Sequence, residues 1–235
     1  MTTSAVAIVI GRAGSRGFPN KNVAPLHGRP LVAHTVETAR AARSVADVIL
    51  STDGAEIARA GAEAGARIIR RPAELASDVA PVDAPVRHAL RTLELDHSVV
   101  VILYANVPVR PPDLIDRAVS ELIDTGADSV QSYTGVGKYH PHWMVRLHDG
   151  HVEPWVATDV YRRQDLPPLY IPDGGVIAVR RRVLLEAEHA ARPDAFLGHD
   201  RRGIVTRPGT VVDIDEPADL ARAEVLATEP YRACA

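Results

Sequence analysis

The sequence predicts an α/β domain of three layers, in which helices cover both faces of a mostly parallel sheet. Short runs rich in Val and Ile alternate along the chain with longer segments whose apolar residues recur every three or four positions. These are the patterns of strands and of amphipathic helices. The strand-like runs are apolar almost throughout, which is typical of strands buried on both faces.

The expected elements can be placed by residue number. Strands are expected at 5–10, 45–52, 66–70, 99–105, 128–134, 174–180 and 210–214, and helices at 30–42, 55–65, 84–95 and 111–126. Ligands of such sheets bind beyond the carboxyl ends of the strands. The residues that directly follow each strand are therefore the candidates for a functional site.

Residues 135–172 interrupt this alternation. The stretch 143–156 predicts a hairpin that turns at Asp149 and Gly150, and an extended, proline-rich, polar stretch follows it. The segment holds both tryptophans and three of the six tyrosines, so we expect it to pack against something, such as a second subunit. We expect residues 1–235 to form one domain, with 135–172 as an inserted hairpin and dimer arm.

Charge and cysteine content exclude several classes of protein. A net charge of −3 provides no overall field for nucleic acid or an anionic membrane, so we expect neither as a partner. Cys234 is the single cysteine, which excludes disulfides and cysteine-based metal sites and favours the cytoplasm. The first residues lack the basic start of a signal peptide and an apolar run long enough to cross a membrane.

The loop after the first expected strand has the composition of a phosphate-binding loop. It contains three glycines and three cations: Gly11, Gly14, Gly17, Arg12, Arg16 and Lys21. Its glycine spacing fits neither the dinucleotide fingerprint nor the Walker loop. Glycines let phosphates approach backbone N–H groups, and the cations neutralise them. A solvated connecting loop is the alternative, and it accounts less well for so much positive charge at a strand end.

Four later stretches also carry patterns: STDGAEIA (51–58), RRPAELASD (70–78), RRQDLPPLYIPDGGVIAV (162–179) and VVDIDEPADLARAE (211–224). Together with GRAGSRGFPNKN (11–22), they resemble the acylneuraminate cytidylyltransferases (CMP-sialic acid synthetases). The resemblance implies the nucleotide-diphospho-sugar transferase fold. It also implies transfer of CMP from CTP to the anomeric hydroxyl of an acidic, nonulosonate-like sugar, with release of pyrophosphate, and it implies Mg²⁺ or Mn²⁺ as cofactor and a homodimer.

The resemblance also assigns roles to single residues. Those implied in catalysis are Arg12, Lys21 and Asp213, and those implied in nucleotide binding are Gly11, Ala13, Gly14, Ser15, Arg16, Asn22, Arg71 and Asp78. Without the resemblance, Arg71 is equally a surface ion-pair partner, and Asp53 is a candidate cap for the helix that begins at Ala55.

Asp213 and Asp215 flank Ile214 in the last expected strand. Strand alternation puts both carboxylates on one face, which is unfavourable unless a cation lies between them. Mg²⁺ prefers few carboxylates together with phosphate oxygens. The alternative makes Asp215 the N-cap of a helix starting at Glu216; the resemblance favours a metal site for the pair.

Residues expected to bind the acceptor are Tyr104, Asn106, Lys138, Arg162, Arg163, Gln164 and Asp173. Arg162 and Arg163 either form a solvated turn or grip a carboxylate with paired hydrogen bonds. The resemblance places this region near the acidic sugar, partly across a dimer interface. His140 and His142 fit hydrogen-bonding groups better than a metal site.

The departures from the family pattern concentrate in the middle of the chain. Tyr104, Asn106 and Val107 stand in place of Gln, Thr and Ser, and Asp173 stands in place of Asn. Val82 lacks a hydroxyl that the family has near the nucleotide. We therefore expect the phosphate machinery to be kept, while the walls of the sugar and base pockets differ.

Other functions stay open at this level. One is the same chemistry with another acceptor, such as a phosphonate, or with another NTP. A second is a non-catalytic nucleotide-sugar-binding module, against which the retention of Arg12, Lys21, Asp213 and Asp215 argues. A glycosyltransferase of similar fold would carry Asp-x-Asp after a middle strand, where this chain has YANVP (104–108).

Overall fold

The architecture is known from a computed structural model that describes residues 4–14, 17–77 and 79–228. A seven-stranded sheet has the order β11-β7-β10-β6-β1-β4-β5. Its strands are β1 (Ala5–Ile10), β4 (Val45–Thr52), β5 (Arg67–Arg70), β6 (Val99–Tyr104), β7 (Ser129–Gly135), β10 (Tyr170–Arg180) and β11 (Arg201–Thr206). β10 runs antiparallel to β6 and β7, and the other neighbours are parallel. The predicted mostly parallel sheet is confirmed.

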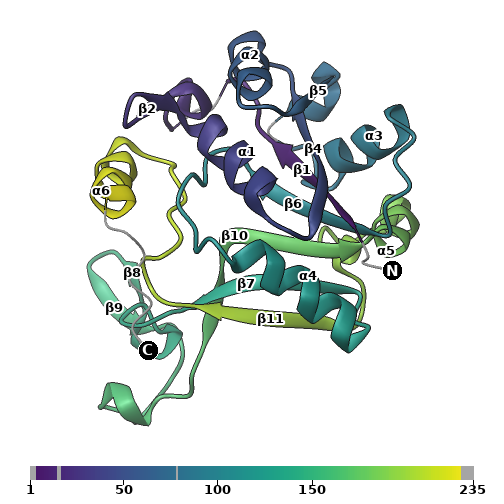
Figure 1. Cartoon of the computed structure of the whole chain (residues 1–235). Coiled ribbons are helices and arrows are strands. Elements are labelled where there is room, and N and C mark those ends of the chain that lie inside the picture. The colour runs from purple at the N-terminus through teal and green to yellow at the C-terminus, as the bar shows by residue number, and fades with distance from the viewer. Residues whose placement is uncertain (1–3, 15–16, 78, 229–235) are drawn as a thin grey trace.

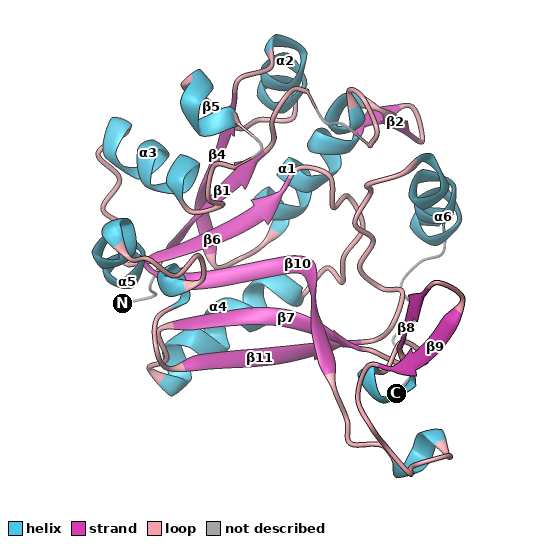
Figure 2. Cartoon of the chain, turned by 180° about the vertical axis from the view of Figure 1, so that it is seen from behind, coloured by secondary structure: helices cyan, strands magenta, loops and turns pink. Residues whose placement is uncertain are grey.

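Helices lie on both faces of this sheet (Figures 1 and 2). They are α1 (Leu31–Ala41), α2 (Ala55–Glu63), α3 (Ala84–Thr92), α4 (Leu114–Thr125), α5 (Arg181–Glu186) and α6 (Pro217–Thr228). The short strands β2 (Pro25–Leu26) and β3 (Arg29–Pro30) pair with each other before α1. None of the helices in the described ranges is long and apolar enough to cross a membrane.

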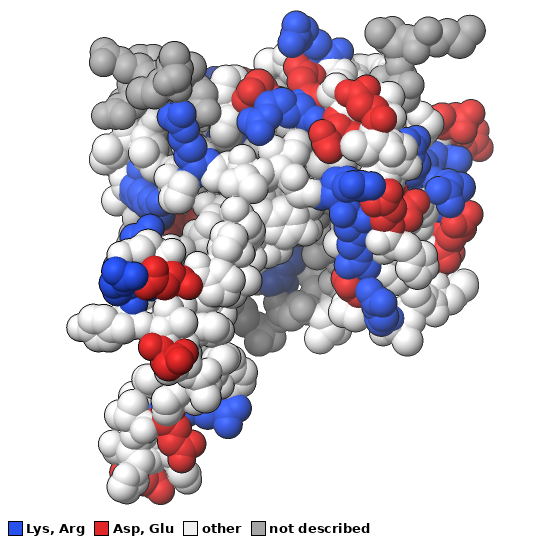
Figure 3. All heavy atoms as spheres, turned by 90° about the horizontal axis from the view of Figure 1, so that it is seen from below, with Lys and Arg blue, Asp and Glu red and all other residues white. Residues whose placement is uncertain are grey.

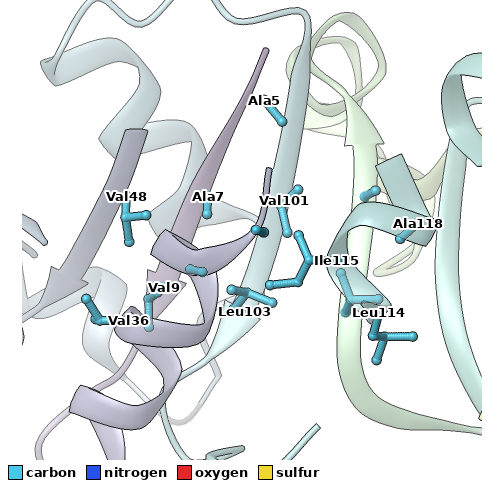
Figure 4. Close-up of a cluster of buried hydrophobic side chains, with 14 of the residues drawn as sticks. Ala5, Ala7, Val9, Val36, Val48, Val101, Leu103, Leu114, Ile115 and Ala118 are labelled. Carbon is cyan, nitrogen blue, oxygen red and sulfur yellow. The ribbon is translucent and has the colours of Figure 1, made fainter. Parts of the chain in front are cut away.

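Strand β1 shows why helices must cover both faces of the sheet. Its alternate residues Ala5, Ala7 and Val9 pack into a core with α1, α2 and α4, part of which is drawn in Figure 4. The intervening residues, such as Ile8, pack into a second core with α3 and α5. All six residues of β1 are buried, because a two-residue period puts neighbours on opposite faces and both faces are covered.

The prediction of a last strand at 210–214 is wrong. This segment forms only an isolated bridge between Val212 and Val109. The seventh strand of the sheet is β11, at the edge opposite β5, and the sequence pattern did not predict it. Val212 and Ile214 are nevertheless buried, in a third core beside Leu31 and α6. The apolar alternation therefore reflects burial against α1 and α6 rather than membership of the sheet.

The predicted hairpin is confirmed. β8 (Val145–His148) and β9 (His151–Pro154) pair antiparallel, and the turn residues Asp149 and Gly150 have φ values of 49° and 81°, as a two-residue hairpin turn requires. The pair lies outside the main sheet, at the left of Figure 1. All eight strand residues are exposed. On the face seen in Figure 3, basic and acidic side chains are intermixed, in keeping with the small net charge.

Candidate active site

A cavity of about 590 Å³ lies beyond the carboxyl ends of β1, β5 and β6. Five segments that are distant in the sequence meet there: the opening loop, the segment after β5, the start of α3, the end of β6 and the segment before α6. Predicted site residues that line it are Gly11, Arg12, Lys21, Asn22, Arg71, Tyr104, Asn106 and Asp215. Unpredicted lining residues include Phe18, Leu75, Pro81 and Pro85, which form an apolar wall.

Two hydrogen bonds and one close approach to the residue after β6 hold the opening loop in place. The backbone N–H of Ala13 donates to Asp53 Oδ1 (2.8 Å), and the side-chain amide of Asn22 donates to the Arg12 carbonyl (2.9 Å). Asp53 is thus a loop anchor, and α2 has no side-chain cap. A Cβ on Gly11 would stand 2.7 Å from Ala105 Cβ, so β1 and β6 approach this closely because residue 11 is glycine.

Asn22 has a property that points to a ligand. It is buried, and its side-chain oxygen has no hydrogen-bond partner within the described ranges. A buried acceptor without a donor costs free energy. Because Asn22 lines the cavity, a ligand that brings a hydroxyl or amino group would satisfy it.

Arg71 carries a buried positive charge into the same cavity. Its Nη2 donates to the Ser51 carbonyl (2.8 Å), and its Nε to the Ser51 hydroxyl (3.3 Å). Burial lowers the pKa of Arg71 to about 10; Asp53 acts in the opposite direction, and Arg12 adds to the lowering. The group stays charged at neutral pH and has further donors to offer an anion or a base.

The acidic pair meets the opening loop through Asp215. Lys21 Nζ is 2.5 Å from Asp215 Oδ1. Asp213 is not among the described residues that line the cavity, but it accepts a hydrogen bond from Asn106, which does line it. Burial and then the charge of Asp215 raise the pKa of Asp213 to about 6, although Lys21 acts against this. The carboxylate of Asp219, in the first turn of α6, accepts from the backbone N–H groups of residues 215 and 216 (3.0 and 2.9 Å).

The end of β6 supplies Tyr104 and Asn106. Burial and the charge of Asp213 raise the pKa of the Tyr104 phenol, and its ring lines the cavity. The side-chain amide of Asn106 donates to Asp213 Oδ1 (2.5 Å) and to the Ile214 carbonyl (3.2 Å). Asn106 therefore touches the acidic pair directly, a contact that no sequence spacing indicated.

Asp173 is not among the described residues that line the cavity and lies instead in a polar cluster with Ser132 and Thr206. Its carboxylate accepts hydrogen bonds from Ser132 Oγ (2.5 Å), Thr206 Oγ1 (2.6 Å) and the Gly175 N–H (2.9 Å). Arg110 is buried nearby and donates to the Val107 carbonyl (2.6 Å). Burial lowers the pKa of Arg110 to about 10, and the charge of Asp173 opposes this.

The remaining predicted acceptor residues do not reach the cavity of their own chain. Lys138, Arg162, Arg163 and Gln164 are exposed and lie on the segment between β7 and β10. Arg162 pairs with Asp165 (2.7 Å), and Arg163 lines a separate hollow of about 190 Å³ with His140 and Tyr170. Ala13 and Gly14 lie on the opening loop, while Ser15, Arg16 and Asp78 fall outside the described residues.

The side chain of His140 is a hydrogen-bonding group, as expected, whereas Nδ1 of His142 is buried and has no hydrogen-bond partner among the described residues. His140 is buried, its Nδ1 accepts from the backbone N–H of His142 (3.3 Å), and its Nε2 lies 3.0 Å from the Pro167 carbonyl. In this arrangement Nε2 carries the proton. His140 thereby ties the start of the segment to its end.

Comparison with known proteins agrees with this geometry. The chain is 32% identical over 184 residues to an N-acylneuraminate cytidylyltransferase of Streptococcus agalactiae, an alignment that covers 77% of this chain and 44% of that protein. It is 27% identical over 228 residues to a CMP-N,N'-diacetyllegionaminic acid synthase of Legionella pneumophila, covering 94% and 95%. The chain thus spans less than half the length of the streptococcal relative.

Two solved structures share the fold. A CMP:2-keto-3-deoxy-manno-octonic acid synthetase, solved with CTP, has a TM-score of 0.74 at 17% identity, covering 95% of this chain and 98% of the other. A 4-diphosphocytidyl-2C-methyl-D-erythritol synthase from Anaerococcus prevotii has a TM-score of 0.66 at 13% identity, covering 97% and 100%. A family model described as Cytidylyltransferase matches residues 6–172. The resemblance found in the sequence is therefore confirmed, and the chain belongs to the cytidylyltransferase family.

Proposed function

We propose that this protein is a CTP-dependent cytidylyltransferase that transfers CMP to the anomeric hydroxyl of an acidic, nonulosonate-like sugar and releases pyrophosphate. One observation carries the proposal. The cationic, glycine-rich opening loop and Asp215 line one cavity, with Lys21 and Asp215 in contact, and Asp213 adjoins this cavity through its hydrogen bond with Asn106. Family membership and relatives whose names specify CMP-sugar synthesis support the same reaction.

In the proposed reaction the acceptor oxygen bonds to the α-phosphorus of CTP, and the bond from that phosphorus to the bridging oxygen of pyrophosphate breaks. The acceptor proton passes to solvent, and the electron pair of the broken bond leaves with pyrophosphate. Arg12 and Lys21, with loop N–H groups, stabilise the charge on the phosphoryl oxygens. Arg71 and Asn22 hold the nucleotide, so catalysis consists of positioning and charge stabilisation without a covalent protein intermediate.

The donor set fits a divalent cation. Two carboxylates flank one residue. Burial, and after it the charge of Asp215, raises the pKa of Asp213 to about 6, and a cation beside the pair relieves this cost of the charged form. Mg²⁺ is bound in such sites by one or two carboxylates plus substrate phosphates. Asp213 and Asp215 would hold Mg²⁺ or Mn²⁺, which when bound neutralises phosphate charge.

We further propose that residues 1–235 form one domain whose segment 135–172 is a dimer arm. Exposed apolar side chains on it include Tyr139, Met144, Val145, Leu147, Val152, Trp155 and Ile171. Contiguous exposed apolar surface is a mark of a protein interface. A homodimer would cover this surface and could bring Arg162 or Arg163 of one copy towards the cavity of the other.

The proposed reaction is tested by a pyrophosphate-release assay in which four NTPs are crossed with a panel of nonulosonates, Kdo-like sugars and small phosphonates. CTP with an acidic sugar should give a CMP-sugar that mass spectrometry identifies, and EDTA should abolish its formation. Preference for a phosphonate or for another NTP would favour the alternative function, which is the same nucleotidyl transfer with a different acceptor or nucleotide. Nucleotide binding without turnover on any acceptor would instead indicate a non-catalytic binding module.

A further inference from the structure

The contacts of Asn106 tie it to the acidic segment at three points. Its Nδ2 donates to Asp213 Oδ1 (2.5 Å) and to the Ile214 carbonyl (3.2 Å), and its own carbonyl accepts from the Ile214 N–H (2.9 Å). Three residues further on, the Val109 carbonyl accepts from the Val212 N–H (3.1 Å). The segment 106–109, which follows β6, and the segment 212–214 therefore form one hydrogen-bonded unit.

These contacts determine which way the Asn106 amide faces. Nδ2 has two hydrogens, and both acceptors, a carboxylate and a carbonyl, lie on its side. The opposite orientation would set an amide oxygen against two other oxygens. Both hydrogens are thus committed to residues 213 and 214, and neither is available to a sugar.

The two carboxylates are held in different ways. Asp215 pairs with Lys21, a cation on the loop that binds phosphate in the proposed reaction. Asp213 is held by an uncharged donor, which fixes the direction of the carboxylate without neutralising its charge. A carboxylate that binds a divalent cation needs both a fixed direction and its full charge, because its oxygen must point towards the cation and must stay negative.

We propose that Asn106 is a positioning residue, whose side-chain amide orients the Asp213 carboxylate for the divalent cation. This inference rests on the proposed function, since the cation at Asp213 and Asp215 belongs to it. The sequence interpretation placed Asn106 in the acceptor pocket. Its contacts instead make it an outer partner of a metal ligand, a class of residue whose loss lowers metal affinity or activity by ~10–100-fold.

The test measures binding of Mn²⁺ to the full chain by electron paramagnetic resonance, with CTP present and no acceptor. In Asn106→Ala the Kd for Mn²⁺ should rise ~10–100-fold, and the half-saturating Mg²⁺ concentration for turnover should rise with it. The KM for CTP at saturating Mg²⁺ should change by less than about threefold, because the loop contacts are intact. Asn106→Thr, whose hydroxyl can donate one hydrogen bond, should recover part of the affinity.

Asp219→Ala is the matched control. It removes the carboxylate that accepts from the N–H groups of residues 215 and 216, and so loosens the same segment without touching the hydrogen bond to Asp213. Its Tm should fall while its Kd for Mn²⁺ stays within about twofold, since the amide that aims the ligand remains.

Three results would overturn the inference. Unchanged Mn²⁺ affinity in Asn106→Ala would do so and would leave CMP transfer standing. An equal loss of affinity in Asp219→Ala would assign the effect to a loosened segment rather than to the amide. If the unaltered protein binds no Mn²⁺ with CTP present, the metal assignment fails together with this inference, whatever the transfer assay shows.

Discussion

At the scale of single residues, Tyr104 bears most on the identity of the acceptor. Tyr104 lines the cavity, and burial and then the charge of Asp213 raise the pKa of its phenol, which is protonated at neutral pH as in any tyrosine. It therefore offers one hydrogen on a bulky ring, where a glutamine amide would offer two donors and an acceptor. A pocket built on hydrogen bonds discriminates strongly when one of them is lost.

We therefore predict that N-acetylneuraminate is a poor substrate and that Tyr104→Gln improves it. Each hydrogen bond lost to a sugar hydroxyl or N-acyl group costs ~1–3 kcal/mol, so kcat/KM for N-acetylneuraminate should rise ~10-fold or more in the variant. The comparison needs kcat/KM for several nonulosonates and smaller acids in both proteins. A clear preference of the unaltered protein for N-acetylneuraminate would count against this reading of the pocket.

The sequence located the loop residues better than it located their partners. Glycines and positive charge at one strand end predict Arg12 and Lys21, the family resemblance predicts Asn22, and all three line one cavity. The hydrogen bond from Asn106 to Asp213 spans 107 residues, and that from Ala13 to Asp53 spans 40. Contacts of this kind depend on how strands are ordered in the sheet, which no local pattern specifies.

At the scale of elements, the sequence predicted the strands buried on both faces and the edge strand β5, but it did not predict the other edge strand, β11. β1 and β4 begin and end at the expected residues, because continuous Val and Ile runs mark strands covered twice. β11 is an edge strand in which Ile204 and Thr206 are the buried residues, so it has little apolar signal. The stronger pattern at 210–214 is satisfied by packing against α1 and α6.

The junction of β1 and β6 yields an element-scale prediction. Gly11→Ala places a Cβ against Ala105 and forces the two strand ends apart beneath the cavity. Overpacking of this kind costs ~1–3 kcal/mol, which corresponds to a fall in Tm of ~2–10 °C, and the transfer rate should fall with it. The control is Gly135→Ala, where nothing lies within 4 Å of the added Cβ. Equal Tm values for the two variants would contradict the close approach.

At the scale of the whole molecule, the segment between β7 and β10 carries apolar surface that the chain itself leaves exposed. Leu147 and Val152 face each other across the hairpin, and their exposed fractions are 74% and 63%. The predicted acceptor residues Arg162, Arg163 and Gln164 lie on the same segment, away from their own cavity. A second copy of the chain would account for both facts.

We predict that the protein sediments as a homodimer and that Leu147→Asp makes it monomeric. A charge at an apolar interface is left without a partner, which opposes association. If the arm supplies Arg162 or Arg163 to the neighbouring site, kcat/KM should fall together with the dimer fraction. Val205→Asp is a suitable control, since Val205 is 54% exposed on edge strand β11 and edge strands tolerate charge. An active monomer at assay concentration would rule out the arm's proposed role.

The most direct test of the account is the rate of CMP-sugar formation from CTP in Lys21→Ala, with Arg59→Ala as the control. Both changes remove one cation, but Lys21 lines the cavity whereas Arg59 lies on α2 and pairs with Glu63. Loss of charge stabilisation at a transferring phosphoryl group should lower kcat/KM of Lys21→Ala by ~10²-fold or more, while Arg59→Ala should stay within about twofold of the unaltered protein because surface ion pairs contribute little. Near-normal turnover in Lys21→Ala would contradict the assignment of this cavity as the site of CMP transfer.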